Sequence, residues 1–137
     1  MESYWPTVVK DPTGDKPMDD FAVLIDDIPK IVYSRTLKNV VWKNSTLKKE
    51  IIKEEIIALK QSSNGGSKNI VVGSPSLIVA LAQLGVVDEY QLAVQPTVLG
   101  SGLQLFKNIR ERIDLKLLKT KTFGCGAVML YYDRAKK

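Results

Sequence analysis

The segment from Val71 to Leu77 carries the residue types best suited to binding a ligand. A β-branched stretch ends at Gly73, and Ser74, Pro75 and Ser76 are residues typical of a helix N-terminus. Free backbone N–H groups and the positive end of the helix dipole make such a turn suitable for a phosphate or pyrophosphate. Many strand-to-helix turns use Gly and Ser for capping alone, so these residues leave ligand binding and simple capping both open.

A second segment of this kind is Ser34-Arg35-Thr36, which follows an apolar stretch that begins at Ile31. In open α/β sheets ligands bind beyond the carboxyl ends of strands, and Arg is the natural partner of a phosphate monoester. The alternative is a loop in which Thr36 caps and Arg35 is solvated. Taken on these residues alone, the solvated loop is the better explanation.

Two further groups of residues are weaker candidates. Gly100 and Gly102 permit unusual backbone geometry, so residues 95–106 form either a loop that lines a cleft or a tight turn, and the turn is favoured. Asp88 and Glu89 are adjacent carboxylates, but a strand would point them to opposite faces. They are therefore a poor acid–base pair.

Several chemistries are excluded by what the chain lacks. Its 137 residues include no histidine, which removes Ser-His-Asp and Cys-His catalysis and every histidine-based metal site. The lone Cys125 excludes an internal disulfide and a multi-cysteine zinc cluster, and it is either a reactive thiol or, as we favour, a small turn residue. We expect no metal, and an enzyme of this composition would need a cofactor for most of its chemistry.

The net charge of +5 does not predict a nucleic-acid partner, because the lysines alternate with acids and no aromatic residues are interleaved with them. A basic pocket for a phosphorylated small molecule explains part of the charge equally well. No apolar run is long enough to span a membrane, and the first residues do not resemble a signal peptide. We therefore expect a cytoplasmic protein with no membrane partner.

The pattern of apolar residues predicts alternating strands and helices, after a stretch of 29 residues that is loop-like apart from one short helix. The expected helices are Pro17 to Ile25, a helix capped by Asn44-Ser45-Thr46 and running to about Gln61, and one from Pro75 through Leu84. The expected strands are Ile31 to Ser34, Val40 to Trp42, Asn69 to Val72, Glu89 to Leu99, Leu115 to Thr122 and Ala127 to Tyr132. The last two should form an antiparallel hairpin, and the whole order indicates a mixed sheet with helices on its faces.

Three motifs follow one another between residues 70 and 106. They are Ile70-Val71-Val72-Gly73-Ser74-Pro75-Ser76-Leu77, Leu84-Gly85-Val86-Val87-Asp88-Glu89-Tyr90-Gln91-Leu92, and Pro96 to Phe106 with Gly100 and Gly102. Through these motifs the chain resembles the C-terminal reductase domain of the riboflavin-biosynthesis deaminase-reductase family. The resemblance extends to Ser3-Tyr4-Trp5-Pro6, to Pro29 to Leu37 and to the final strands, which together cover nearly the whole chain.

The resemblance implies a dihydrofolate-reductase-like, three-layer α/β/α fold with a central mixed, mostly parallel sheet that ends in an antiparallel hairpin. It also implies NADPH as cofactor. Ser34 and Arg35, followed by Thr36, would lie at the adenosine 2′-phosphate, and Gly73, Ser74, Pro75 and Ser76, followed by Leu77, near the pyrophosphate and nicotinamide. No catalytic residue is assigned by it.

From this resemblance we expect a bacterial NADPH-dependent reductase of a small pterin- or pyrimidine-like substrate. It would be similar to dihydrofolate reductase and to 5-amino-6-(5-phosphoribosylamino)uracil reductase. The alternative is a non-catalytic nucleotide-binding or interaction module. Residues 1–137 are expected to be a single reductase-like domain that begins later than the family pattern, without its first strand and Gly-Arg-x-Thr helix, and we expect a homodimer that covers the exposed sheet edge.

Overall fold

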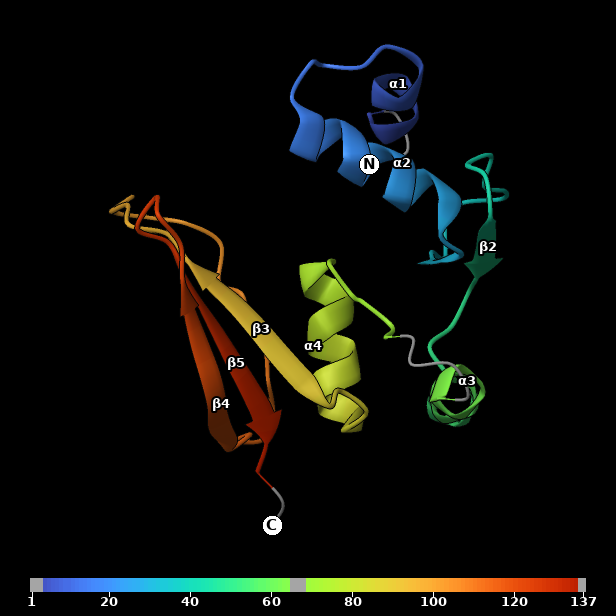
Figure 1. The fold of residues 1–137 in the computed structure, drawn as a ribbon. Coiled ribbons are helices and arrows are strands. Elements are labelled where there is room, and N and C mark those ends of the chain that lie inside the picture. The colour runs from blue at the N-terminus through green and yellow to red at the C-terminus, as the bar shows by residue number, and fades with distance from the viewer. Residues whose placement is uncertain (1–3, 65–68, 136–137) are drawn as a thin grey trace. The chain divides into compact units, whose positions relative to one another are not determined.

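The computed structural model describes residues 4–64 and 69–135. The chain forms two compact units, residues 1–52 and residues 53–137, and Figure 1 labels all of their elements except β1. The first unit contains α1 (Trp5–Lys10), α2 (Lys16–Asp27), β1 (Lys30–Tyr33) and β2 (Ser45–Lys48). The second contains α3 (Lys53–Asn64), α4 (Pro75–Leu84), β3 (Glu89–Val94), β4 (Leu115–Thr122) and β5 (Val128–Arg134).

The two helices of the first unit pack through aromatic rings. The rings of Trp5 on α1 and Phe21 on α2 meet edge to face, with their centroids 4.9 Å apart. Val8 and Ala22 are buried. The predicted helix from Pro17 to Ile25 is confirmed as part of α2, and residues 11–15 are loop as predicted, but the loop-like prediction is wrong for Trp5–Lys10, which form α1. Its apolar and aromatic residues form a small helical core instead.

Lys30 joins the end of α2 to β1. Its Nζ donates hydrogen bonds to three backbone carbonyls, those of Ile25 (3.0 Å), Asp26 (2.9 Å) and Ile28 (2.9 Å). The same Nζ lies 4.6 Å from the centre of the Trp42 ring, and Trp42 Nε1 donates to Asp26 Oδ1 at 2.7 Å. The predicted strand Val40 to Trp42 is therefore wrong, because these contacts hold Trp42 against the end of α2 instead of in a ladder.

β1 and β2 are parallel, in a register that pairs Lys30 with Ser45 and Tyr33 with Lys48. The prediction of a helix that begins at Asn44-Ser45-Thr46 is wrong at its start. Asn44 has φ +56°, in the left-handed region, whereas an N-cap residue has extended backbone angles. The helix, α3, begins at Lys53, and its first turn contains two glutamates that favour the positive helix end.

The sheet of the second unit is antiparallel with the strand order β3-β5-β4. The predicted hairpin is confirmed, with β4 at the predicted bounds. β3 ends at Val94, five residues before the predicted Leu99, because its last partner, Val128, is the first residue of β5. Pro96 also lacks the N–H that a longer ladder would need.

The prediction of a buried strand from Asn69 to Val72 is wrong. Ile70 is 45% exposed and Val71 is 88% exposed, and within the described residues this segment belongs to neither sheet. β-Branched residues favour a strand only where a neighbouring strand accepts the pairing. Parallel pairing is therefore confined to β1 and β2, and the described strands do not form one mostly parallel sheet. The mixed α/β class is confirmed.

α4 agrees with its prediction and ends at Gly85, which has a left-handed φ of +72°. Leu81 and Ala82 of this helix are buried. In the part of the chain that the structure describes, no helix has the length and apolar character needed to cross a membrane.

Candidate functional site

α4 begins at the predicted position, directly after Ser74, although residues 69–73 before it form no strand. Ser74 is its N-cap residue with extended backbone angles (φ −88°, ψ 121°), and its carbonyl accepts the Ile78 N–H at 2.8 Å. The Ser74 side chain makes no capping hydrogen bond, and its Oγ instead lies 3.2 Å from Ser76 Oγ. The N–H groups of the first turn are thus left without a side-chain cap, as a bound phosphate would require.

Gly73 borders open space at this turn. A Cβ built on Gly73 would meet no other atom of the described structure within 4 Å. Gly73 and the three residues after it are exposed, while Leu77 is half-buried. The chain therefore leaves room at Gly73 for the close approach of a ligand, which a side chain would occupy.

The segment Ser34-Arg35-Thr36 lies at the carboxyl end of β1, in the first unit. Ser34 N donates to Lys48 O at 3.0 Å, which continues the parallel ladder by one residue. Ser34 Oγ accepts the Leu37 N–H at 3.1 Å and lies 3.4 Å from Thr36 Oγ1. The two hydroxyls thus close a local turn.

Arg35, at the tip of this turn, is exposed. Its guanidinium has no ion pair or hydrogen bond with any residue that the structure describes. The arrangement agrees with the solvated-loop alternative and equally presents a guanidinium for a phosphate. The residues of each predicted set are neighbours within their own unit, Ser34 to Thr36 in the first and Gly73 to Leu77 in the second.

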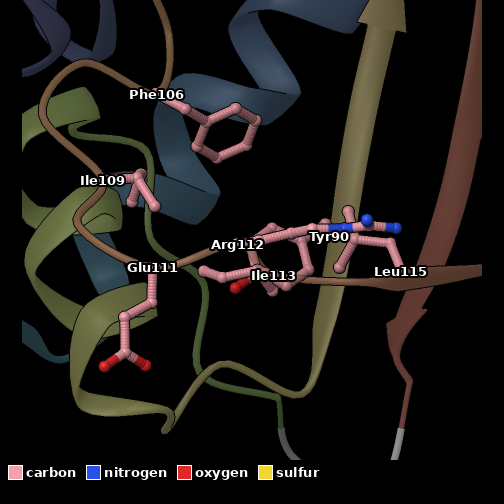
Figure 2. A pocket seen from close by; sticks show the side chains of 7 residues that line it. All are labelled: Tyr90, Phe106, Ile109, Glu111, Arg112, Ile113 and Leu115. Atoms are coloured by element: carbon pink, nitrogen blue, oxygen red, sulfur yellow. The ribbon is translucent and has the colours of Figure 1, made fainter.

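The second unit also contains a small cavity that the sequence analysis did not identify. Its volume is about 190 Å³, and Figure 2 shows the side chains that line it. They come from β3, from the connection between β3 and β4, and from the first residue of β4: Tyr90, Phe106, Ile109, Glu111, Arg112, Ile113 and Leu115. The 95–106 segment thus contributes to the cavity wall through Phe106, in agreement with the alternative of a loop that lines a cleft.

Tyr90 is the most buried of the aromatic residues at this cavity, with 5% of its surface exposed. Its ring meets that of Phe106 edge to face, with centroids 6.1 Å apart. Burial raises the pKa of the Tyr90 phenol above its ordinary value, and the Arg134 guanidinium opposes this rise in pKa. Tyr90 is therefore a neutral hydrogen-bond donor at neutral pH.

Comparison with other proteins places the chain among known relatives. It is 38% identical over 109 residues to YyaP, an uncharacterized protein of Bacillus subtilis. The aligned region covers 80% of this chain and 56% of YyaP. The chain is 39% identical over 77 residues to YwjB of the same organism, and this aligned region covers 56% of this chain and 42% of YwjB. The chain thus spans about half the length of these two relatives.

Two solved structures share the fold. A protein assigned to riboflavin biosynthesis from Shewanella sp. PV-4 superposes with a TM-score of 0.67 at 19% identity, over 89% of this chain and 71% of that one. A pyrimidine reductase-like protein from Corynebacterium diphtheriae gives a TM-score of 0.54 at 18% identity, over 92% of this chain and 48% of that one. Both support the predicted mixed α/β fold class.

The sequence model that describes the RibD C-terminal domain matches residues 1–129. This match includes both predicted cofactor segments and all three motifs of residues 70–106. It covers well over half of the chain, so the chain belongs to the RibD C-terminal domain family.

Proposed function

We propose that this chain is an NADPH-dependent reductase of a small heterocyclic substrate of the pterin or pyrimidine type. The family membership, the neighbour from riboflavin biosynthesis and the pyrimidine reductase-like neighbour support a reductase role. The observation that carries the choice of cofactor is the uncapped start of α4 beside the open backbone of Gly73.

This turn fits the pyrophosphate of a dinucleotide. The backbone N–H groups of Ser76 and Leu77 and the hydroxyls of Ser74 and Ser76 are donors, and the positive end of the α4 dipole favours negative charge. The room at Gly73 allows the group to come close to the main chain. Pro75 has no N–H to offer, and its ring fixes the first turn of the helix.

Arg35 would give the preference for NADPH over NADH. A guanidinium binds a phosphate monoester through two parallel hydrogen bonds, and the 2′-phosphate is the group that distinguishes the two cofactors. Because Arg35 is exposed and has no partner among the described residues, no existing ion pair must be broken for it to bind a phosphate. Ser34 and Thr36 hold the loop that presents it.

The bound cofactor supplies the hydride for reduction. The residues of this chain bind and orient it, and a chain without histidine contributes no imidazole for proton transfer. The protein therefore acts mainly by positioning the cofactor and the substrate. Such positioning can lower a reaction barrier by roughly 7–11 kcal/mol in favourable cases.

The proposal is tested by adding NADPH together with dihydropterins or with oxidised pyrimidine and pterin compounds, and following the absorbance of the reduced nicotinamide. We expect steady oxidation of NADPH with at least one substrate class and much slower oxidation with NADH. Tight NADPH binding without turnover for any of them would favour the non-catalytic nucleotide-binding module, and absence of binding would contradict the proposal.

A further inference from the structure

We propose that the cavity between β3 and the segment 106–115 is a second binding site, for one uncharged aromatic ring that carries a hydrogen-bond acceptor. The cavity lies within the second unit and belongs to neither predicted cofactor segment. Its size, its lining and the state of the Tyr90 hydroxyl each define part of the ligand.

The size of the cavity sets the limit on the ligand. Its volume of about 190 Å³ is somewhat larger than an engineered apolar cavity of about 150 Å³ that is known to bind benzene. One six-membered ring fits, and a dinucleotide or a three-ring heterocycle does not. The ligand is therefore a single ring or an aliphatic group of similar volume.

The lining selects an apolar, uncharged ligand. Five of the seven lining side chains are aromatic or aliphatic, and the rings of Tyr90 and Phe106 meet edge to face. The charge of Arg112 is already paired, since its Nε lies 2.6 Å from Asp114 Oδ1. An aromatic ring would gain both apolar burial and edge or face contacts with these two rings.

The Tyr90 hydroxyl provides the polar contact. Only 5% of the Tyr90 surface is exposed, yet its hydroxyl makes no hydrogen bond with any residue that the structure describes. Every side-chain N or O atom that is fully buried in the described residues has a hydrogen-bond partner. The Tyr90 hydroxyl has none among these residues, so it is accessible to solvent. Figure 2 shows it pointing away from β3, toward the segment that carries Ile109 and Glu111. An acceptor atom on the ring would satisfy this donor.

This site is separated from the cofactor turn by the length of α4. Gln83, near the end of the helix, donates from Nε2 to the Asn108 carbonyl at 2.7 Å, beside the cavity-lining Ile109. The turn at Ser74 is at the other end of the ten-residue helix, about 15 Å away at about 1.5 Å per residue. A ring in the cavity would bind beside the C-terminal end of α4, independently of NADPH.

The test compares pyridine and benzene, which have nearly the same size but differ in one acceptor atom. Each is titrated into the full chain at a pH where pyridine is neutral, while NMR records the methyl signals of Ile109 and Ile113. We expect saturable shifts of both methyl groups with both ligands. Tyr90→Phe should lower the affinity for pyridine relative to benzene by about two- to tenfold, the range for one net hydrogen bond.

Two further variants keep the result interpretable. Tyr131→Phe removes a hydroxyl from β5, from a tyrosine that does not line the cavity, and should leave the pyridine-to-benzene ratio unchanged. Ile109→Phe should fill the cavity and abolish the saturable shifts while the fold, monitored by amide signals, is kept. Absent shifts in the wild type, or a ratio that is the same in wild type and in folded Tyr90→Phe, would overturn the proposal. Neither cofactor nor turnover enters the measurement, so its outcome is separate from that of the reductase proposal.

Discussion

The Arg134 side chain lies directly against the backbone of Gly85. Gly85 ends α4 with a φ of +72°, and a Cβ at this position would collide with the Arg134 guanidinium. Its N–H donates to the Ala82 carbonyl at 3.0 Å. This one glycine thus serves both the end of the helix and the close packing of the last strand against it.

Gly85→Ala should therefore destabilise the protein. The left-handed backbone costs a residue with a Cβ about 1–2 kcal/mol, and the displacement of the Arg134 guanidinium, at the far end of a flexible side chain, adds only a small further cost. The measurement is the free energy of unfolding in urea. Gly124→Ala is the matched control, because a Cβ there meets nothing within 4 Å and Gly124 has no left-handed φ.

The double variant Gly85→Ala, Arg134→Ala separates the two costs. Removal of the arginine should recover the part of the loss that is caused by the collision and leave the part that is caused by the backbone. If Gly85→Ala is no more destabilising than Gly124→Ala, the described contact does not form in solution.

Asp19 should make stability depend on pH in acid. It accepts hydrogen bonds from Thr13 N (2.9 Å), Thr13 Oγ1 (2.8 Å) and Gly14 N (3.1 Å). These hydrogen bonds lower the pKa of Asp19 below its ordinary value of 3.8, and the bond from the Thr13 backbone N–H has the largest effect. A carboxylate with a lowered pKa stabilises the folded state above its ordinary pKa, and this stabilisation is lost as the pH falls through the lowered pKa.

The check is the melting temperature from pH 6 down to about pH 2, since the ordinary pKa of Asp is close to 4. Asp19→Asn should show a shallower fall in melting temperature over the acid range than the wild type. Asp20→Asn is the control, because Asp20 forms an exposed ion pair with Lys16 at 2.7 Å. Parallel curves for wild type and Asp19→Asn would show that the pKa of Asp19 is not lowered.

The sequence predicts those elements whose signals are local. The Pro at the start and the Gly at the end fix α4, and two turn glycines and alternating residues fix the C-terminal hairpin. Asn69 to Val72 and Ser45 to Lys48 were assigned wrongly because strand formation depends on the partner. Val71 is β-branched but pairs with no strand among the described residues, whereas Thr46 pairs with Ile31 although it follows an Asn and a Ser, residues typical of helix caps.

The same distinction applies to the sites. Gly73 to Ser76 can be proposed from sequence because these residues are contiguous at the start of one helix. The cavity at Tyr90 could not, since it forms only where the segment containing Phe106 and Ile113 folds back beside β3. The available signals were a tyrosine at a buried position of a strand and the Leu-Phe pair at the end of the third motif, and neither specifies a cavity.

Arg35→Ala should weaken the preference for NADPH over NADH. Loss of a bidentate contact between guanidinium and phosphate should raise the dissociation constant of NADPH by about tenfold or more and leave that of NADH nearly unchanged. Calorimetric titration of both cofactors measures this. Lys38→Ala, an exposed cation nearby in the same loop, should change neither constant strongly; if Arg35→Ala behaves as Lys38→Ala does, Arg35 does not bind the 2′-phosphate.

We also expect a homodimer that covers apolar side chains of the second unit. Val98 is 97% exposed, Leu99 is 80% exposed and Leu103 is fully exposed at 103%. Neighbouring apolar side chains of this kind are typical of interfaces. Light scattering at micromolar concentration should give twice the mass of one chain, and Leu99→Asp with Leu103→Asp should give a folded monomer. A wild-type monomer would contradict this expectation.

The most direct test of the account is the NADPH affinity of Gly73→Val. A Cβ at Gly73 would meet no described atom within 4 Å apart from its chain neighbours, so folding should be little affected, but the valine side chain would occupy the space through which the pyrophosphate approaches the start of α4. Gly102→Val is the matched control, because that exposed glycine also has open space around its Cβ position. We predict that Gly73→Val keeps the melting temperature of Gly102→Val but binds NADPH at least about tenfold more weakly. Equal NADPH affinity in the two folded variants would contradict the assignment of the cofactor to this turn.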